Sequence, residues 1–404
     1  TVGSNDRGFK FYVIEVPFLT TDLLASEENR TRAKNFYQRT NLNEDISEIW
    51  IYRGLKHSSL NQSRTHDPSQ ADVFFIAGLN NLRFAIFKFD FPRGQALDDI
   101  LRPYIFNATK PHVMATPRTR NRIGLNHMVD SLKRLGVNPH ALGYERSPFW
   151  QSVAQDRIVT VPYVVKPSQS KDELQTAIRS IPRNENFTFY AGDTRPLASR
   201  FGGCDRTNLI KNIPQNRTDT FVRLFFNKRH RLSQQEYNHR METSDYCLIV
   251  CGDTPTSRSL ASAMVAGCIP IFIGSRWRGF CEPPCHSGWG WQITNGMAHF
   301  PYPHELKWDV FPEVDEATFA NDPVTALQEV FAGQSPARRL EIRAAMAETQ
   351  LHWIYGWDNP VDSERIGEAT STIWKSVVQH LLTTGDLAMP EEGSKTASNT
   401  SEVA

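Results

Sequence analysis

A short stretch near the middle of the chain has the residue types of an anion-binding site. It begins with an apolar strand at Tyr246, passes through a tight turn at Gly252 and enters a helix before Ser259. Thr254 is placed to cap that helix, and Pro255 suits its first position because a first-turn residue leaves its backbone N–H unused. A helix start presents unpaired N–H groups, which favour a bound anion. The pattern therefore predicts either a diphosphate site or a well-capped helix without a ligand, and the residues alone do not separate the two.

Several other chemistries are excluded by motifs that the chain lacks. It has no Gly-x-x-x-x-Gly-Lys-Ser/Thr phosphate loop, no Gly-x-Gly-x-x-Gly fingerprint, no Gly-x-Ser-x-Gly elbow and no His-Glu-x-x-His zinc helix. It also lacks an Asp-x-Asp pair, which could hold Mn²⁺ or Mg²⁺ against a diphosphate. Cys281, Cys285 and His286 do not have the spacing of a zinc finger. We therefore expect no metal site and no required cofactor.

Apolar segments alternate with amphipathic ones along the chain, which is typical of an α/β fold. In the first half, the expected strands are Lys10–Val16, Asp72–Gly78, His112–Ala115 and Arg157–Val165, and the expected helices are Thr21–Arg39 and Asn126–Leu135. In the second half, the strands are Phe187–Ala191, Phe221–Phe226, Tyr246–Val250 and Ile269–Ile273, and the helices are Arg206–Ile213, Ser233–Thr243 and Thr256–Ala266. Two further helices are expected, one from Ser335 through Trp353 and one from Asp362 toward Leu382.

The length of 404 residues predicts two domains rather than one core. The polar stretch Lys166–Asn186 separates the two series, so we expect domains at 1–166 and 167–345, closing helices at 346–385 and a disordered tail at 386–404. With 45 basic and 44 acidic residues the net charge is +1, which argues against a nucleic-acid partner bound by bulk electrostatics. No apolar run approaches the ~20 residues that span a bilayer.

Six Asn-x-Ser/Thr sequons, spread over both halves, favour a secretory-pathway lumen. These glycosylation candidates are Asn29, Asn61, Asn107, Asn186, Asn216 and Asn399. The six cysteines are compatible with that compartment. Cys247, Cys251 and Cys268 lie in apolar runs and are interpreted as buried thiols or one bridge. Cys281 and Cys285 flank Glu-Pro-Pro and could close a short disulfide.

The central stretch resembles a family signature. Tyr246-Cys247-Leu248, then Gly252-Asp253-Thr254-Pro255-Thr256-Ser257, then Ala266-Gly267-Cys268-Ile269-Pro270 is similar to the donor-site signature of exostosin-type glycosyltransferases (glycosyltransferase family 47), in its plant and algal form. Weaker matches in the same order are Asp67–Phe75 to "DPxxADxFF", Gly124–His127 to "GRNH", Asp156–Tyr163 to "DIVxPPY" and Phe189–Arg195 to "FFAGxxR". The resemblance covers roughly residues 67–280.

The resemblance implies a GT-B fold, in which two facing Rossmann-like α/β domains enclose the substrate cleft. It implies transfer of a sugar from a nucleotide sugar, expected to be UDP-linked, to a hydroxyl of a polysaccharide or a glycoprotein glycan, with inversion and without an essential metal. Members of the family are usually type II membrane proteins of the Golgi, so a membrane anchor is expected upstream of residue 1. Both a homodimer and a heterodimer are compatible with the resemblance.

Inverting transfer needs stabilisation of the leaving diphosphate and a base for the acceptor hydroxyl. The donor site is assigned to Gly192, Arg195, Arg206, Gly252, Asp253, Thr254, Thr256, Ser257, Arg258 and Ser262. Arg195 follows an expected strand, and its alternative role is a surface ion pair.

The base is assigned to His127, expected at the start of its helix, where the helix N-terminus would keep the imidazole neutral. A capping or core histidine is the alternative. Asp130, one turn on, would orient His127, act as the base itself or be a simple exposed acid.

The chain departs from the family pattern at several places, among them Arg258, which lies one position early, and Arg276–Cys285, which lacks the usual acidic pattern. It has Ser259-Leu260-Ala261-Ser262 where the family often has Arg-Leu-Phe-Asp, and an acid at the last position would be expected to hold the ribose hydroxyls of the donor. Leu125 replaces the arginine of the "GRNH" motif. These departures leave a second function open, that of a catalytically weak family member acting as a partner subunit or a glycan-binding scaffold.

Overall fold

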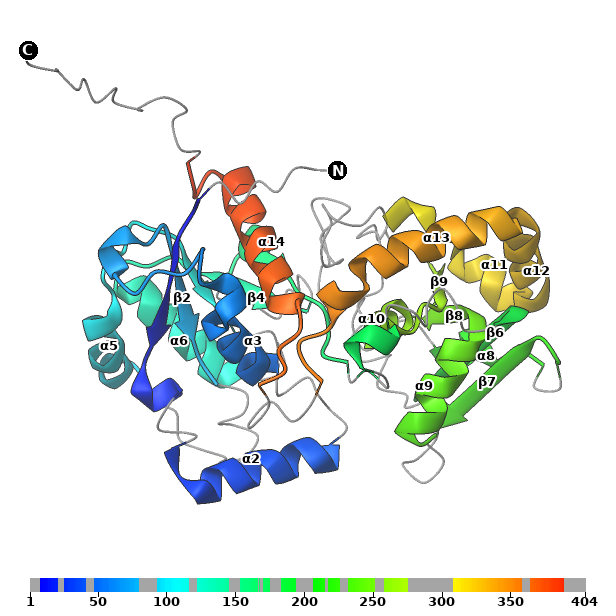
Figure 1. Ribbon diagram of the computed structural model, residues 1–404, viewed down its shortest axis with the longest axis horizontal. Helices are drawn as coiled ribbons and strands as arrows, with labels where there is room; N and C mark the ends of the chain where they lie inside the picture. The colour runs from blue at the N-terminus through cyan, green and yellow to red at the C-terminus, as the bar shows by residue number, and fades with distance from the viewer. Residues whose placement is uncertain are drawn as a thin grey trace, which may run out of the picture.

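The computed structural model describes most of the chain. The described residues are 8–20, 25–40, 47–79, 93–115, 122–144, 153–165, 167, 170–174, 183–193, 206–214, 217–225, 232–250, 258–274, 308–357 and 364–388, and within some helices and strands only the backbone is described. They form two five-stranded sheets in which every strand pair is parallel. Figure 1 shows the two sheets in separate halves of the molecule. The α/β class expected from the sequence is therefore confirmed.

The first sheet lies in the N-terminal half and has the order β1-β2-β3-β4-β5. Its strands are β1 (Phe11–Glu15), β2 (Val73–Ala77), β3 (His112–Met114), β4 (His140–Gly143) and β5 (Ile158–Thr160). Arg64 forms one further parallel bridge to Phe11, on the side of β1 away from β2. The strands of this sheet therefore follow one another in chain order from β1 to β5.

Helices cover both faces of this sheet. They are α3 (Ser47–Lys56) on one face and α5 (Gln95–Leu101) and α6 (Arg122–Arg134) on the other, whereas α2 (Glu27–Thr40) lies apart from the sheet (Figure 1). Alternate residues of each strand enter different cores, because side chains in a strand point to opposite faces. Phe75 packs in a core with Trp50 of α3, whereas its neighbour Phe74 packs in another with Leu97 of α5 and Met128 of α6.

The second sheet has the order β10-β9-β8-β6-β7. Its strands are β6 (Asn184–Asp193), β7 (Thr220–Phe225), β8 (Ser244–Val250), β9 (Ile269–Ile273) and β10 (Glu313–Val314), and its helices are α8 (Arg206–Lys211), α9 (Gln234–Thr243), α10 (Arg258–Ala266), α11 (Glu316–Asn321), α12 (Pro323–Gly333) and α13 (Pro336–Thr349). Cys247 in β8 and Cys268 beside β9 form a disulfide, which settles the choice between buried thiols and a bridge for that pair. Cys251, Cys281 and Cys285 lie outside the described residues.

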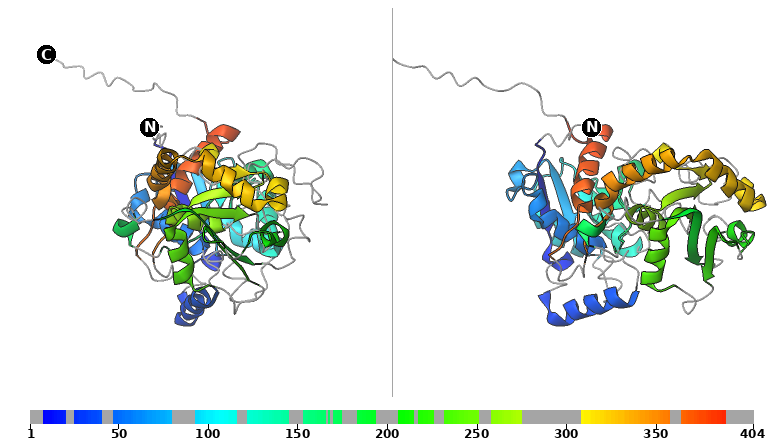
Figure 2. Two further views of the ribbon diagram at one scale, coloured as in Figure 1. Left: turned by 90° about the vertical axis from the view of Figure 1, so that its right-hand side faces the viewer. Right: turned by 45° about the vertical axis from the view of Figure 1, so that its right-hand side comes forward.

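The last helix, α14 (Ala369–Thr384), returns to the first sheet (Figures 1 and 2). Its Trp374 packs against Phe11 of β1, with ring centroids 4.8 Å apart. The connecting segment is fixed as well, because the buried Tyr355 donates its hydroxyl hydrogen to the carbonyl of Pro162 at 3.0 Å. The chain therefore ends its described part on the half of the molecule in which it began.

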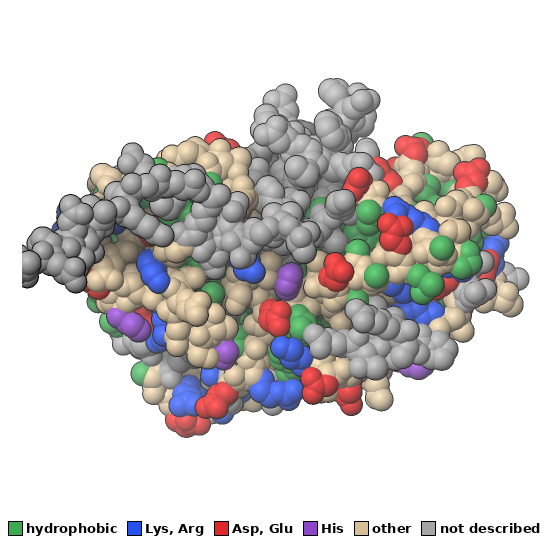
Figure 3. All heavy atoms as spheres, turned by 45° about the horizontal axis from the view of Figure 1, so that its top comes forward, with side chains coloured by type: hydrophobic (Ala, Val, Ile, Leu, Met, Phe, Trp, Pro, Cys, Tyr) green, Lys and Arg blue, Asp and Glu red, His purple; other side chains and the backbone are tan. Residues whose placement is uncertain are grey.

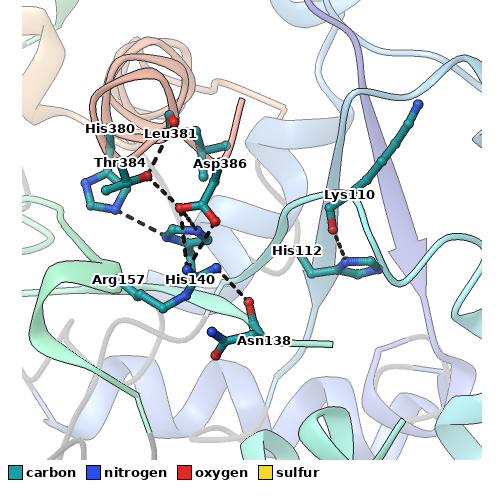
Figure 4. Close-up of polar contacts among 9 residues, drawn as sticks. All are labelled: Lys110, His112, Asn138, His140, Arg157, His380, Leu381, Thr384 and Asp386. Carbon is teal, nitrogen blue, oxygen red and sulfur yellow. Dashed lines mark hydrogen bonds and ion pairs between the residues drawn. The ribbon is translucent and has the colours of Figure 1, made fainter. Parts of the chain in front are cut away.

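A buried polar cluster fastens the end of α14 to the first sheet (Figure 4). His140 of β4 is fully buried, with Nδ1 3.2 Å from Nε2 of His380 and Nε2 3.3 Å from a carboxylate oxygen of Asp386. Arg157 donates to Asp386 at 3.1 Å and to the carbonyl of Asn138 at 2.8 Å. Burial, then the charges of Arg157 and His380, hold the pKa of His140 well below its ordinary value. This cluster therefore joins β4, β5 and α14 with a neutral imidazole at its centre.

The sequence located most strands but missed several elements. The strands β4 and β10 and the helices α3, α5, α11 and α12 were not expected, and β5 ends at Thr160 rather than continuing to Val165. Of the expected interdomain stretch Lys166–Asn186, the last three residues belong to β6. The domain limits at residues 166, 345 and 385 stay predictions. Of the expected tail 386–404, residues 386–388 are described, with Asp386 paired to Arg157, and 389–404 lie outside the described residues.

On the face shown in Figure 3, the described acidic and basic side chains are intermingled, so neither charge dominates it. This agrees with the net charge of +1. A search of the described residues found no helix long and apolar enough to cross a membrane.

Candidate functional site

The second sheet has its switch point between β6 and β8. From β6 the chain passes through α8 to β7 on one side, and then through α9 to β8 and through α10 to β9 on the other. In open α/β sheets, ligands bind outside the carboxyl ends of the strands at such a point. The neighbouring strands β6 and β8 end at Asp193 and Val250. The two segments predicted to bind the donor follow directly after these two residues, so the topology brings their starting points to one edge of the sheet.

The predicted donor residues are only partly described. Arg195, Gly252, Asp253, Thr254, Thr256 and Ser257 lie outside the described residues, and of Arg206, the first residue of α8, only the backbone is described. Gly192 lies in β6, Arg258 begins α10 and Ser262 follows one turn later. The expected helix Thr256–Ala266 is confirmed from Arg258 onward.

The side chain of Tyr190 fills the space beside Gly192 that a larger residue would need. A Cβ atom added at Gly192 would lie 2.2 Å from the phenol oxygen of Tyr190, two residues back on the same face of the strand. Tyr190 is itself buried, so its ring has little room to move away. The glycine of the "FFAGxxR" resemblance is therefore required by packing at the end of β6, next to the switch point.

A tyrosine that the sequence did not single out lies where α9 packs against α10 and β6. It is Tyr237 of α9. Burial is the largest effect on its phenol and raises its pKa, so the hydroxyl stays protonated at neutral pH. The side chains of Ser259 and Ser262 and the charge of Arg258 each act to lower that pKa. The ring of Tyr237 packs edge-on against Phe189 of β6, with centroids 5.5 Å apart. Tyr237 thus links the strand that ends beside Gly192 to the helix that carries Arg258.

The far end of α10 is capped by buried polar side chains. Arg183 donates to the carbonyl of Ala266 at 2.7 Å and to that of Ser244 at 2.9 Å, and Gln350 donates to the carbonyl of Val265. Burial lowers the pKa of Arg183 to about 10, but the guanidinium remains charged at neutral pH. A cation at the C-terminal end of a helix is favourable because the helix dipole is negative there. The position of α10 is therefore fixed from the opposite edge of the sheet.

The candidate base lies deeper in its helix than expected. The helix α6 begins at Arg122 rather than Asn126, so His127 is in the second turn and the argument that placed it at a helix N-terminus is wrong. Its side chain is half-buried, which leaves it neither a core residue nor fully exposed. Asp130 is exposed, and its charge acts on Arg134 one turn further along. Because α6 follows β3, its first turns lie at the carboxyl edge of the first sheet.

The helix α6 is held in place from its other end. Arg134 donates two hydrogen bonds to the carboxylate of Asp98 in α5, at 2.8 and 2.9 Å, and Ser131 donates a third. These partners lower the pKa of Asp98 to about 2. The half-buried His127 is thus carried by a helix that is fixed against both the sheet and α5.

The N-terminal "DPxxADxFF" stretch serves the fold. Asp67 accepts hydrogen bonds from the backbone and hydroxyl of Ser69 and caps a short helical turn, and Asp72 accepts from the backbone N–H of Lys10 beside β1. Both carboxylates therefore hold backbone at the edge of the first sheet. In the part of the chain that the structure describes, no group of three or more His, Cys, Asp or Glu side chains could hold a metal ion.

Comparison with known proteins gives one family. Residues 6–312 match the family model described as the exostosin GT47 domain, which covers both sheets up to the start of β10. A comparison with curated proteins gave no significant match.

Proposed function

The chain belongs to the exostosin GT47 family, and we propose on that premise that it transfers a sugar from a UDP-sugar to a hydroxyl of a polysaccharide or a glycoprotein glycan, with inversion. Its two parallel sheets and returning C-terminal helix form the GT-B fold. The observation that supports the donor assignment is the pairing of β6 with β8, since both predicted donor segments follow from these adjacent strand ends. The plant and algal branch of the family stays a prediction from the central motif.

In this proposal the second sheet binds the leaving group. The diphosphate accepts hydrogen bonds at the start of α10, and Arg258 and Arg195 offset its charge. The acceptor oxygen forms a bond to the anomeric carbon as the bond from that carbon to the diphosphate oxygen breaks. The electron pair of the broken bond stays on the UDP, so the site stabilises a charge that grows during the reaction.

The first sheet supplies the base in this proposal. The proton of the acceptor hydroxyl passes to His127, and Asp130 is the second candidate because it lies three residues further along the same helix. The topology supports this division, because the helix that carries His127 follows β3 of the first sheet, whereas both predicted donor segments follow strands of the second. The transfer uses no required metal, and the nucleotide sugar is a co-substrate rather than a cofactor.

A second function remains a candidate because Ser259 and Ser262 replace a charged pair of the resembled family. A chain that binds nucleotide weakly could act as a partner subunit or a glycan-binding scaffold, as part of a homodimer or a heterodimer. Calorimetric titration with UDP separates the two. The transferase is expected to bind UDP, and Arg195→Ala should weaken that binding about ten- to a hundredfold, since a hydrogen bond involving a charged group contributes about 1.5–3 kcal/mol.

Arg32→Ala is a matched control, because Arg32 is an exposed arginine of α2 that pairs with Glu28 one turn earlier. The control should bind UDP as the wild type does. No heat of binding with UDP or with any UDP-sugar, from a protein that is folded by circular dichroism, would contradict the transferase and favour the scaffold.

We also propose a secretory-pathway location, in the Golgi, with a membrane anchor upstream of residue 1. The sequons support it: Asn61 and Asn107 are exposed and Asn29 is half-exposed, whereas the side chains of Asn186, Asn216 and Asn399 lie outside the described residues. A mass shift on endoglycosidase treatment of protein from a eukaryotic host is expected. An unchanged mass would contradict the glycosylation.

A further inference from the structure

The chain passes from the second half of the molecule to the first through residues 350–357, which we call the crossing segment (Figures 1 and 2). It begins with a short helical turn, Gln350–Trp353, which follows α13 and packs against both α10 and α14. Its central residues, Trp353, Ile354 and Tyr355, are fully buried. A connection between two domains is ordinarily exposed and polar. The crossing segment is therefore packed as part of a core.

One end of the crossing segment is bonded to the second half. The side-chain amide of Gln350, which is fully buried, donates to the carbonyl of Val265 near the end of α10. The ring of Trp353 packs edge-on against Trp308, with centroids 6.0 Å apart. Trp308 in turn packs edge-on against Phe272 of β9. The crossing segment thus holds both α10 and a strand of the second sheet.

The other end is bonded to the first half. Tyr355 donates its hydroxyl hydrogen to the carbonyl of Pro162, two residues after β5, at 3.0 Å. A Cβ atom added at Gly356 would lie 2.2 Å from the ring of Trp50 in α3. Trp50 is itself buried, and a close-packed core leaves such a ring little room to move aside. The backbone of the crossing segment therefore lies directly against the first half.

The crossing segment is also paired with the chain that leads into α14. Gly356 and Ile366 form an antiparallel bridge, and the N–H of Gly367 donates to the carbonyl of Tyr355 at 2.8 Å. A Cβ atom added at Gly367 would lie 1.9 Å from the carbonyl oxygen of Ile354, so the two passages of chain are in direct contact. Two passages joined by hydrogen bonds bend less readily than one, so this connection is built as a rigid element.

We propose that Tyr355 is a positioning residue for the transfer, which fixes the exit of β5 in the first half relative to α10 in the second. This rests on the proposed function, which places the donor at α10 and the acceptor on the first half. The hydroxyl of Tyr355 makes the bond at one end, and the amide of Gln350 makes the bond at the other. Because the connection is rigid, the two halves open together, and a ligand bound to the second half also stabilises the first.

Hydrogen exchange of backbone amides, measured by mass spectrometry with and without UDP, tests this coupling. UDP at about a hundred times its Kd should slow exchange about a hundredfold in β9, because opening of the second half releases the ligand. In the wild type we expect similar slowing in β2 and α3 of the first half. In Tyr355→Phe, the calorimetric Kd for UDP should be unchanged, and the slowing in β2 and α3 should fall below about threefold.

Gln350→Met tests the opposite end of the crossing segment and keeps the test intact if Tyr355→Phe does not fold. It removes the amide that reaches Val265, keeps much of the side-chain volume and should also uncouple the first half from UDP. Tyr52→Phe is the matched control, because the hydroxyl of Tyr52 in α3 accepts from Lys56 at 3.3 Å, away from the crossing segment. Its exchange should respond to UDP as that of the wild type does.

Two results overturn the inference while the proposed function stands. One is a wild type in which UDP slows exchange in the second half alone, since the halves then open independently. The other is a pair of variants, Tyr355→Phe and Gln350→Met, that are less stable but whose first half still responds to UDP, which would make both contacts merely structural.

Absence of UDP binding by the wild type overturns the proposed function, and the coupling is then judged by urea alone. Exchange in rising urea should give β2 and β9 the same free energy of opening in the wild type, and two different values in Tyr355→Phe. Two different values already in the wild type would overturn the rigid connection.

Discussion

The guanidinium of Arg183 lies 2.7 Å from the carbonyl oxygen of Ala266, so the residue that precedes β6 holds the last residue of α10. The same side chain donates to Ser244 at the start of β8. One half-buried cation therefore ties together the two strands and the helix from which the candidate donor site is built. Its partners are all backbone carbonyls, which cannot move away without unwinding an element end.

We expect Arg183→Met to destabilise the protein by about 3 kcal/mol or more. The variant keeps much of the side-chain volume but leaves buried carbonyls without a donor, and hydrogen bonds to a charged group are worth about 1.5–3 kcal/mol each. Urea denaturation measures the free energy of unfolding directly. Arg32→Ala, an exposed arginine on α2, should change it by less than about 1 kcal/mol. Equal effects of the two substitutions would contradict the role given to Arg183.

The disulfide Cys247–Cys268 should stabilise the second sheet measurably. It closes a loop with a sequence separation of 21 residues that contains the whole of α10. Closing such a loop lowers the conformational entropy of the unfolded chain, which stabilises the folded state by about 3 kcal/mol. We therefore expect the double variant Cys247→Ala/Cys268→Ala to unfold at lower urea concentration, and UDP binding to survive where the protein is still folded. An unchanged midpoint would show that the cross-link adds no stability.

Replacement of His127 should separate binding from turnover. The base acts on the acceptor hydroxyl in the transition state, so His127→Ala should lower kcat about a hundredfold or more and leave UDP affinity nearly intact. The partly exposed side chain makes a large loss of stability unexpected. Asp130→Asn is the companion variant. A large loss of kcat with Asp130→Asn and none with His127→Ala would move the role of base to Asp130.

Acid should destabilise the protein through two buried histidines. Burial lowers the pKa of His112 to about 4 and also lowers that of His140, whereas a histidine in the unfolded chain titrates near 6.5. His112 donates from Nδ1 to the carbonyl of Lys110 at 2.8 Å, and its Nε2 has no hydrogen-bond partner among the described residues, so a second proton would be buried unpaired. The unfolded state therefore binds more protons below about pH 6.5, and the free energy of unfolding falls as the pH decreases.

This loss should amount to about 1.4 kcal/mol per pH unit for each histidine, well below pH 6. Urea denaturation at several pH values between 8 and 4.5 gives the slope. His112→Gln should lower the slope of the unfolding free energy against pH by the contribution of one proton. His239→Gln, which changes an exposed histidine, should leave this slope unchanged. A stability that does not vary with pH in this range would mean that the buried histidines are protonated in the fold.

The sequence by itself located most of the strands and predicted the chemistry of the central motif. Buried parallel strands such as β8 and β9 contain continuous apolar runs, so Tyr246–Val250 and Ile269–Ile273 could be recognised without any partner. Shorter pieces such as β4 and β10 have two to four residues, and they become strands only because a neighbouring edge offers hydrogen bonds. The same limit moved the start of α6 from Asn126 to Arg122, since helix ends depend on local contacts.

Only the tertiary structure decided which residues meet. Tyr237 and Phe189 are 48 positions apart in the sequence, and neither segment carries a pattern that points to the other. Their rings pack together because β6 lies between β7 and β8, which turns α9 back past the strand that ends at Asp193. The same is true of His140 and Asp386, which meet because α14 returns to the first sheet. Periodicity fixes each element, but the winding order of the sheet sets the contacts between elements.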